Sequence, residues 1–111
     1  MLADDLAVMV YQVTKKFPQS ELYGLVSQLR RAVTSVPANI AEGSSRASKK
    51  EYLHFLYIAR GSMAETEYFL HLSRRLGYIS GSEYEGLDSA RNQAASTLQG
   101  LIKAVQSEVE H

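Results

Sequence analysis

The sequence predicts an all-α protein, a single domain built as an up-down-up-down bundle of four helices. Apolar residues recur every three or four positions in four long segments, which is the period of an amphipathic helix. The chain has only two prolines, and residues that favour strands form no runs. Short polar stretches separate the four segments, so consecutive helices are expected to lie antiparallel to one another.

We expect helices at about residues 3–16, 20–42, 48–76 and 81–109, within one domain covering residues 1–111. In the first helix, Asp4 and Asp5 stand in the first turn and Lys15 and Lys16 in the last, where their charges complement the helix dipole. Pro18 is expected to end this helix, because a proline cannot continue the backbone hydrogen bonds.

The second helix is expected to begin at Ser20, a residue type that favours the N-cap position. Its apolar spacing continues through Pro37, so we predict one helix that is kinked at this proline. A complete break at Pro37 is the alternative. Gly43 is expected to end the helix, since glycine commonly follows the last helical turn.

The third and fourth helices each begin with a serine followed three residues later by a glutamate, the pattern of a capping box. These pairs are Ser48 with Glu51 and Ser80 with Glu83. Gly77 stands between the two helices and is expected to end the third.

The third helix is apolar over most of its circumference. At 100° per residue, one row of residues forms the predicted core side, and Ile58, Phe69 and Leu76 widen it. The core row contains Tyr52, Phe55, Leu56, Ala59, Met63, Thr66, Leu70 and Ser73. A second row lies beside it and contains Leu53, Tyr57, Arg60, Ala64, Tyr68 and His71.

A helix that is apolar on more than one side is normally buried on more than one side. We therefore predict that Leu53, Tyr57, Ala64 and Tyr68 form a subunit interface, for which tyrosine is well suited. Exposed tyrosines on a monomer are the alternative. Gly61 lies in the middle of this helix, where glycine costs about 1 kcal/mol relative to alanine, and close approach of another backbone would explain it.

Twelve basic residues balance twelve acidic ones, and this neutrality argues against tight non-specific binding of nucleic acid. A local patch remains possible, and the candidate phosphate contacts are Arg30, Arg31, Arg46, Lys49 and Lys50. A solvated basic surface is the alternative. Around Pro37, Asn39 and Glu42 are interpreted as structural, by local hydrogen bonding and pairing with a nearby arginine. A polar or RNA-binding groove that also includes Arg31 and Arg46 is the sharper alternative.

No pattern in the chain indicates catalysis or a cofactor. The sequence has no cysteine and three histidines, and it lacks a glycine-rich phosphate loop after a strand. A Glu-x-x-His spacing occurs at Glu51–His54 and at Glu108–His111, as in di-iron bundles. The other two helices lack a glutamate mid-way along their length, so we expect no metal site, no cofactor and no enzymatic activity.

The expected location is the cytoplasm. The first residues carry no positive segment followed by an apolar run, so they do not resemble a signal peptide. No stretch contains the roughly 20 apolar residues needed to span a bilayer, and a membrane is not an expected partner.

The sequence resembles the four-helix bundle family encoded in intervening sequences of large-subunit ribosomal RNA genes. The resemblance is carried by Phe17-Pro18, Glu21, Tyr23-Gly24-Leu25, Gln28-Leu29-Arg30-Arg31-Ala32, Ser35-Val36-Pro37-Ala38-Asn39-Ile40-Ala41-Glu42-Gly43, Arg46, Ser48, Phe55-Leu56, Ile58-Ala59, Gly61-Ser62, Glu65, Glu67 and Leu76-Gly77-Tyr78. It covers nearly the whole chain and implies a ring-like homopentamer. A related branch, the accessory variability protein of diversity-generating retroelements, is a strongly basic pentamer that binds nucleic acid and a reverse transcriptase.

This chain departs from that branch in its neutral charge, and it lacks the N-terminal segment usual in the family, so we expect either a naturally shortened variant or an artificially truncated form. The resulting hypothesis is a non-enzymatic homo-oligomer, pentameric by resemblance, that binds RNA or DNA or a nucleic-acid-handling protein. The alternative is a protein-interaction scaffold that makes no contact with nucleic acid.

Overall fold

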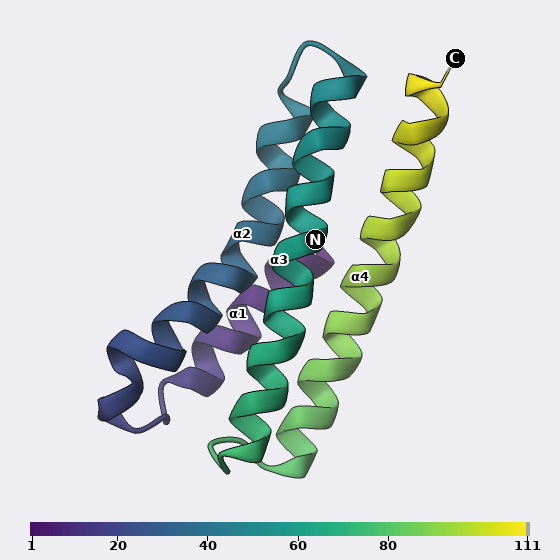
Figure 1. The fold of residues 1–111 in the computed structure, drawn as a ribbon. Coiled ribbons are helices and arrows are strands. Elements are labelled where there is room, and N and C mark those ends of the chain that lie inside the picture. The colour runs from purple at the N-terminus through teal and green to yellow at the C-terminus, as the bar shows by residue number, and fades with distance from the viewer. Residues whose placement is uncertain (111) are drawn as a thin grey trace.

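The computed structural model describes residues 1–110 and shows four helices packed as a bundle (Figure 1). They are α1 (Leu2–Thr14), α2 (Ser27–Ser44), α3 (Lys49–Arg75) and α4 (Gly81–Val109). Each helix packs against two others, in the order α1, α2, α3, α4 and back to α1. The predicted fold class is therefore confirmed. His111 lies outside the described residues, so the predicted Glu108–His111 pair is not part of the description.

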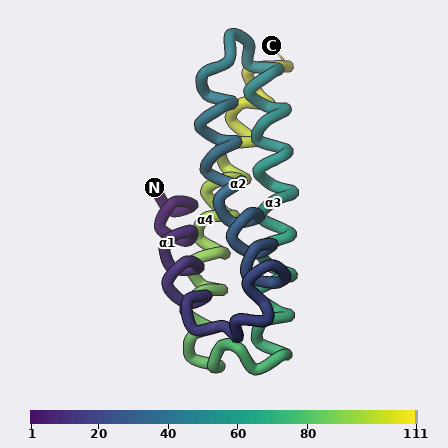
Figure 2. Tube along the Cα trace, turned by 90° about the vertical axis from the view of Figure 1, so that its left-hand side faces the viewer, coloured from purple at the N-terminus to yellow at the C-terminus, as the bar shows by residue number. Residues whose placement is uncertain are grey.

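The four helices differ in length, and α1 is much the shortest, with 13 residues against 27 in α3 and 29 in α4. At 1.5 Å per residue, α1 spans about 20 Å and α3 about 40 Å. Figure 2 shows α1 beside the lower part of the molecule, close to the turn between α3 and α4. The end that carries the turn between α2 and α3 is consequently built from three helices.

The core runs along the axis of the bundle and is lined by all four helices. The largest fully buried apolar side chains are Leu6, Leu29, Leu56, Leu70, Ile79 and Ile102. Ile79 belongs to the turn between α3 and α4, so this turn closes one end of the core. Thr66 and Ser73 are also buried, and their hydroxyls donate hydrogen bonds to carbonyl oxygens one turn earlier in α3.

The chain enters α2 through an irregular segment. A 3₁₀ turn at Gln19–Glu21 is followed by π-helical turns at Leu22–Val26, with Gly24 at φ −109° and ψ −108°. The expected N-cap at Ser20 is wrong, because Ser20 lies inside the 3₁₀ turn. The Glu21 carboxylate takes that role by accepting the backbone N–H of Leu25 at 3.4 Å.

Two residues of α2 test the predictions about where the second helix is interrupted and where it ends. The helix continues through Pro37, so the alternative of a complete break is wrong, while a kink at this residue stays a prediction. Gly43 was expected to end the helix, but it is helical and buried. A Cβ there would lie 2.8 Å from Cβ of Phe55 and 2.9 Å from Cδ1 of Tyr52. Glycine is required because α2 and α3 approach closely at this point.

Of the two predicted capping boxes, that of Ser80 with Glu83 is complete, whereas at Ser48 with Glu51 the structure shows the serine half. The Ser48 hydroxyl accepts the backbone N–H of Glu51 at 3.1 Å. The Ser80 hydroxyl likewise accepts the N–H of Glu83 at 3.1 Å, and the Glu83 carboxylate accepts the N–H of Ser80 at 2.8 Å. Gly77 adopts a φ of +79° after α3, which confirms it as the residue that ends this helix.

Candidate assembly surface and basic clusters

The side of α3 that faces away from the core is a continuous surface of mainly apolar residues. We call it the outer face of α3, and it consists of His54, Tyr57, Ile58, Gly61, Ala64, Glu65 and Tyr68. Tyr57 is 37% exposed, Ile58 40% and Tyr68 56%. In Figure 1, α3 lies in front of the other helices.

The four predicted interface residues are not equally available. Ala64 and Tyr68 are exposed. Leu53 is partly buried and packs against the core. The Tyr57 hydroxyl accepts a hydrogen bond from Nε2 of Gln106 on α4 at 2.7 Å. Leu53 and Tyr57 therefore also take part in contacts within the chain.

Two residues that were placed beside the core row are instead on the surface. Ile58 is 40% exposed and Leu76 48% exposed, so their assignment to the core side is wrong. The helix α2 packs against the row containing Ser62, whose hydroxyl donates to the Ser35 hydroxyl at 2.9 Å. Ile58 lies about 40° further around α3 than Ser62, which leaves it outside this contact and widens the outer face.

Gly61 lies at the middle of the outer face and is open. A Cβ built on Gly61 would meet no atom within 4 Å. No other part of the described chain approaches Gly61, so the close backbone contact suggested by the sequence could come only from outside the described chain.

Arg30 and Arg31, two of the predicted phosphate contacts, are engaged near the start of α2. Nε of Arg30 donates to Oγ1 of Thr14 at 2.9 Å, and the guanidinium lies 4.5 Å from the centroid of the Tyr11 ring. The Arg31 guanidinium pairs with the Glu65 carboxylate at 2.7 Å. These contacts join α1 to α2 and α2 to α3.

The other three predicted contacts lie beyond the opposite end of α2, and the 14 helical residues from Arg30 to Ser44 alone span about 21 Å. Arg46 forms an ion pair with Glu42 and lies over the Phe55 ring at 4.8 Å. Lys49 pairs with Glu108 at 3.3 Å. Lys50 is exposed and forms no ion pair within residues 1–110. The structure thus divides the five predicted residues into two separate clusters.

A shallow groove of about 700 Å³ lies next to this second cluster. It is lined by Arg46, Lys50, Glu51, Leu53, His54, Phe55, Tyr57 and Val109. The groove is mainly apolar with cationic side chains at its edge, and it covers the first two turns of α3.

The segment after Pro37 makes the local contacts expected of a structural element. Nδ2 of Asn39 donates to the Ser35 carbonyl at 2.8 Å and to its hydroxyl at 2.9 Å. The Ser35 hydroxyl is in turn bonded to Ser62 of α3. Together with the pairing of Glu42 and Arg46, these bonds support the structural interpretation of this segment.

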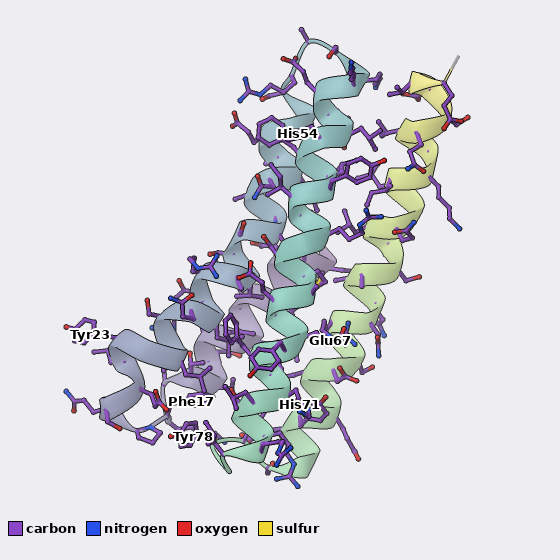
Figure 3. The ribbon with its side chains drawn as sticks, in the orientation of Figure 1. Phe17, Tyr23, His54, Glu67, His71 and Tyr78 are labelled. Atoms are coloured by element: carbon purple, nitrogen blue, oxygen red, sulfur yellow. The ribbon has the colours of Figure 1, made fainter. Side chains whose placement is uncertain are left out.

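The histidines of α3 stand apart from one another. Figure 3 shows His54 near one end of α3 and His71 near the other. Within residues 1–110 no three histidine, aspartate or glutamate side chains are grouped so that they could hold a metal ion. No helix in the same part of the chain combines the length and apolar character that crossing a membrane requires.

Sequence reasoning missed two features. Arg91 is 8% exposed and joins α3 to α4, with ion pairs of 3.0 Å to both Glu67 and Asp88. Tyr23 is 92% exposed, more than Tyr11, Tyr57 or Tyr68. The proximity of Tyr23 to Pro18 and Gly24 was the available signal, since irregular backbone interrupts the helical period.

The family model for 23S rRNA-intervening sequence proteins matches residues 1–100 of the chain. The chain belongs to this family. A similar structure is the crystal structure of a protein of unknown function from the S23 ribosomal protein family of Bacteroides thetaiotaomicron. The two are 28% identical over 92% of this chain and 95% of that one, with a TM-score of 0.84. No curated protein matches the chain. Membership of the intervening-sequence family agrees with the resemblance seen in the sequence.

Proposed function

We propose that this intervening-sequence protein is a non-enzymatic module that assembles with copies of itself through the outer face of α3. The observation that carries the proposal is the exposure of Tyr57, Ile58 and Tyr68 on one side of α3. Glu65 lies within this surface, and Arg60 lies over the Tyr57 ring at its edge. Burial of such a surface against a partner is favourable at roughly 25 cal/mol per Å² of apolar area. Tyrosines suit an interface because the ring is apolar and the hydroxyl tolerates water at the rim.

Gly61 supports the same surface. Its missing side chain leaves the middle of the outer face open, so a helix from a neighbouring chain can approach the backbone of α3. The family resemblance implies five copies in a ring, and we adopt the homopentamer as the proposed assembly.

The assembly is tested by light scattering on the wild type and on a double variant, Ile58→Glu with Tyr68→Glu. We expect a mass of five chains for the wild type and one chain for the variant, since two carboxylates would be buried without partners. Ala104→Glu adds a charge to an exposed position of α4 and should leave the mass unchanged. A wild type that is monomeric at micromolar concentration would refute the proposal.

The ring is further proposed to bind nucleic acid, or a protein that handles it, through Arg46, Lys49 and Lys50. The observation that favours this role is their grouping at one end of the bundle, beside the apolar groove. A ring repeats this cluster around its axis, and repeated weak phosphate contacts give a larger total affinity.

Binding to RNA is tested at low salt with Lys50→Glu, and with Lys103→Glu as a control at another exposed lysine. We expect weaker binding and a smaller salt dependence for Lys50→Glu alone, because each lost phosphate contact lowers the salt slope by about 1. If the wild type shows no RNA binding at low salt, the scaffold alternative is favoured. That alternative predicts a protein partner whose capture survives treatment with nuclease.

A further inference from the structure

A second exposed apolar cluster lies at the junction of α1 and α2. We call it the Tyr23 patch, and it consists of Tyr11, Leu22 and Tyr23, with Arg30 and Arg31 at its rim. Tyr23 is 92% exposed, Tyr11 42% and Leu22 39%. A hollow of about 370 Å³ opens between these side chains. The proposed function assigns no role to this surface.

The Tyr23 patch and the outer face of α3 point in different directions. Figure 3 shows Tyr23 at the edge of the molecule, directed away from the bundle and away from α3. After a quarter turn, Figure 2 places the segment that carries Tyr23 in front and α3 at the side. One chain therefore carries two apolar surfaces, which meet at the ion pair between Glu65 of the outer face and Arg31 at the rim of the patch.

The patch is held on a fixed backbone. The Glu21 carboxylate accepts the N–H of Leu25 at 3.4 Å through one oxygen and the hydroxyl of Tyr78 at 2.9 Å through the other. These bonds secure the π-helical turns on both sides of Tyr23. An exposed aromatic ring on a secured segment loses little conformational entropy on binding.

Charged groups of opposite sign occur on the two surfaces. The outer face contains the carboxylate of Glu65, while the Arg60 guanidinium lies over the Tyr57 ring at 4.9 Å, at the edge of the face. At the rim of the patch, Arg30 contacts only the neutral groups of Thr14 and Tyr11 and has no ion pair within residues 1–110. Arg31 is also at the rim, and its pair with Glu65 of the same chain is half-exposed, so it contributes little stability and can rearrange.

We infer that the outer face of α3 in one chain packs against the Tyr23 patch of the next chain. This inference rests on the proposed ring assembly. A surface that contacts its own copy is satisfied by two chains, so a ring of five requires two different surfaces that fit each other. The outer face and the Tyr23 patch provide such a pair.

The experiment mixes two monomeric variants, each with one damaged surface. The first carries Ile58→Glu with Tyr68→Glu and keeps the patch, and the second carries Leu22→Glu with Tyr23→Glu and keeps the outer face. Each is expected to be monomeric alone. An equal mixture is expected to form a two-chain species held by one contact. This species cannot add further chains, because its two remaining surfaces are both damaged. It is detected as energy transfer between the two variants, each labelled with a different fluorophore.

Two results would overturn the inference. One is any oligomer formed by the patch variant alone, and a two-chain species is the form expected if the outer face pairs with itself. The other is the absence of the two-chain species from the mixture. The single change Tyr23→Glu, at an almost fully exposed site, provides a variant that cannot disturb the core and should also reduce the assembly. A monomeric wild type would instead refute the proposed assembly itself, so the two failures are distinguishable.

Discussion

The inner and outer faces of α3 are both apolar, but only the inner face is covered by the same chain. Leu56 and Ala59 are completely buried, and Met63 is 4% exposed. Tyr57 and Tyr68, on the same helix, remain exposed. The comparison shows that the hydrophobicity of a helix face indicates that a partner is needed, without indicating whether the partner belongs to the same molecule.

The largest expected difference between the faces is in the stability of the isolated chain. Leu56→Ala should lower the free energy of unfolding by about 2–5 kcal/mol, because it leaves a cavity in a packed core. Ile58→Ala should change it by less than about 0.5 kcal/mol when the chain is monomeric. Denaturant unfolding at low protein concentration measures both. Similar losses for the two variants would mean that Ile58 is buried within the chain.

Two helical glycines provide a matched test of the same contrast. Gly43→Ala should destabilise the chain by about 1–3 kcal/mol through overpacking against Phe55 and Tyr52. Helix propensity alone predicts the opposite sign, a gain of about 1 kcal/mol. Thermal unfolding decides between them, and a stabilised Gly43→Ala variant would contradict the close approach of α2 and α3.

Gly61→Ala should have a smaller effect of opposite sign. A Cβ at this position meets nothing in the chain, so the isolated chain should gain roughly 0.5–1 kcal/mol from the better helix former. Assembly should weaken, because the added methyl group stands where the neighbouring chain is proposed to approach. Unfolding at low concentration and light scattering at high concentration separate the two effects, and unchanged assembly would argue against a contact centred on Gly61.

The parts of the fold that the sequence predicted correctly depend on short-range rules. Ser80 with Glu83 and Gly77 each act within one turn of helix, so their types and spacing were sufficient to place the helix ends. The apolar period likewise identified four helices. The role of Gly43 was misread because it depends on Phe55, which is distant in the chain. The role of Glu21 was overlooked because it depends on Tyr78, which is also distant.

The candidate surfaces were predictable only in outline. An angular count on α3 identified excess apolar surface, but the 40° between Ile58 and Ser62 decided which residues α2 covers. The five basic residues were selected by type, whereas their ion pairs and their division into two clusters depend on the packing of α2. The residues of the Tyr23 patch do not recur with a helical period in the sequence, and only the packed structure shows that their side chains share one surface.

The smallest expected effect concerns the hydrogen bond that secures the Tyr23 patch. The bond from the Tyr78 hydroxyl to the Glu21 carboxylate raises the pKa of Tyr78 above its usual value, and partial burial and the carboxylate charge act in the same direction. Because the pKa is higher in the folded chain, this contribution is complete below about pH 10 and is lost as the pH rises through the raised value.

Tyr78→Phe should remove this dependence on pH while keeping the ring against Phe17, whose centroid lies 5.3 Å away (Figure 3). We expect faster amide hydrogen exchange at Leu22–Val26 in the variant at neutral pH, and no further increase above about pH 10. In the wild type, exchange at the same residues should rise only at alkaline pH, after correction for the intrinsic rate. Exchange in the centre of α3 should be the same in both proteins, because its inner face does not depend on this bond. An equal alkaline response of wild type and variant would show that Tyr78 does not secure the patch.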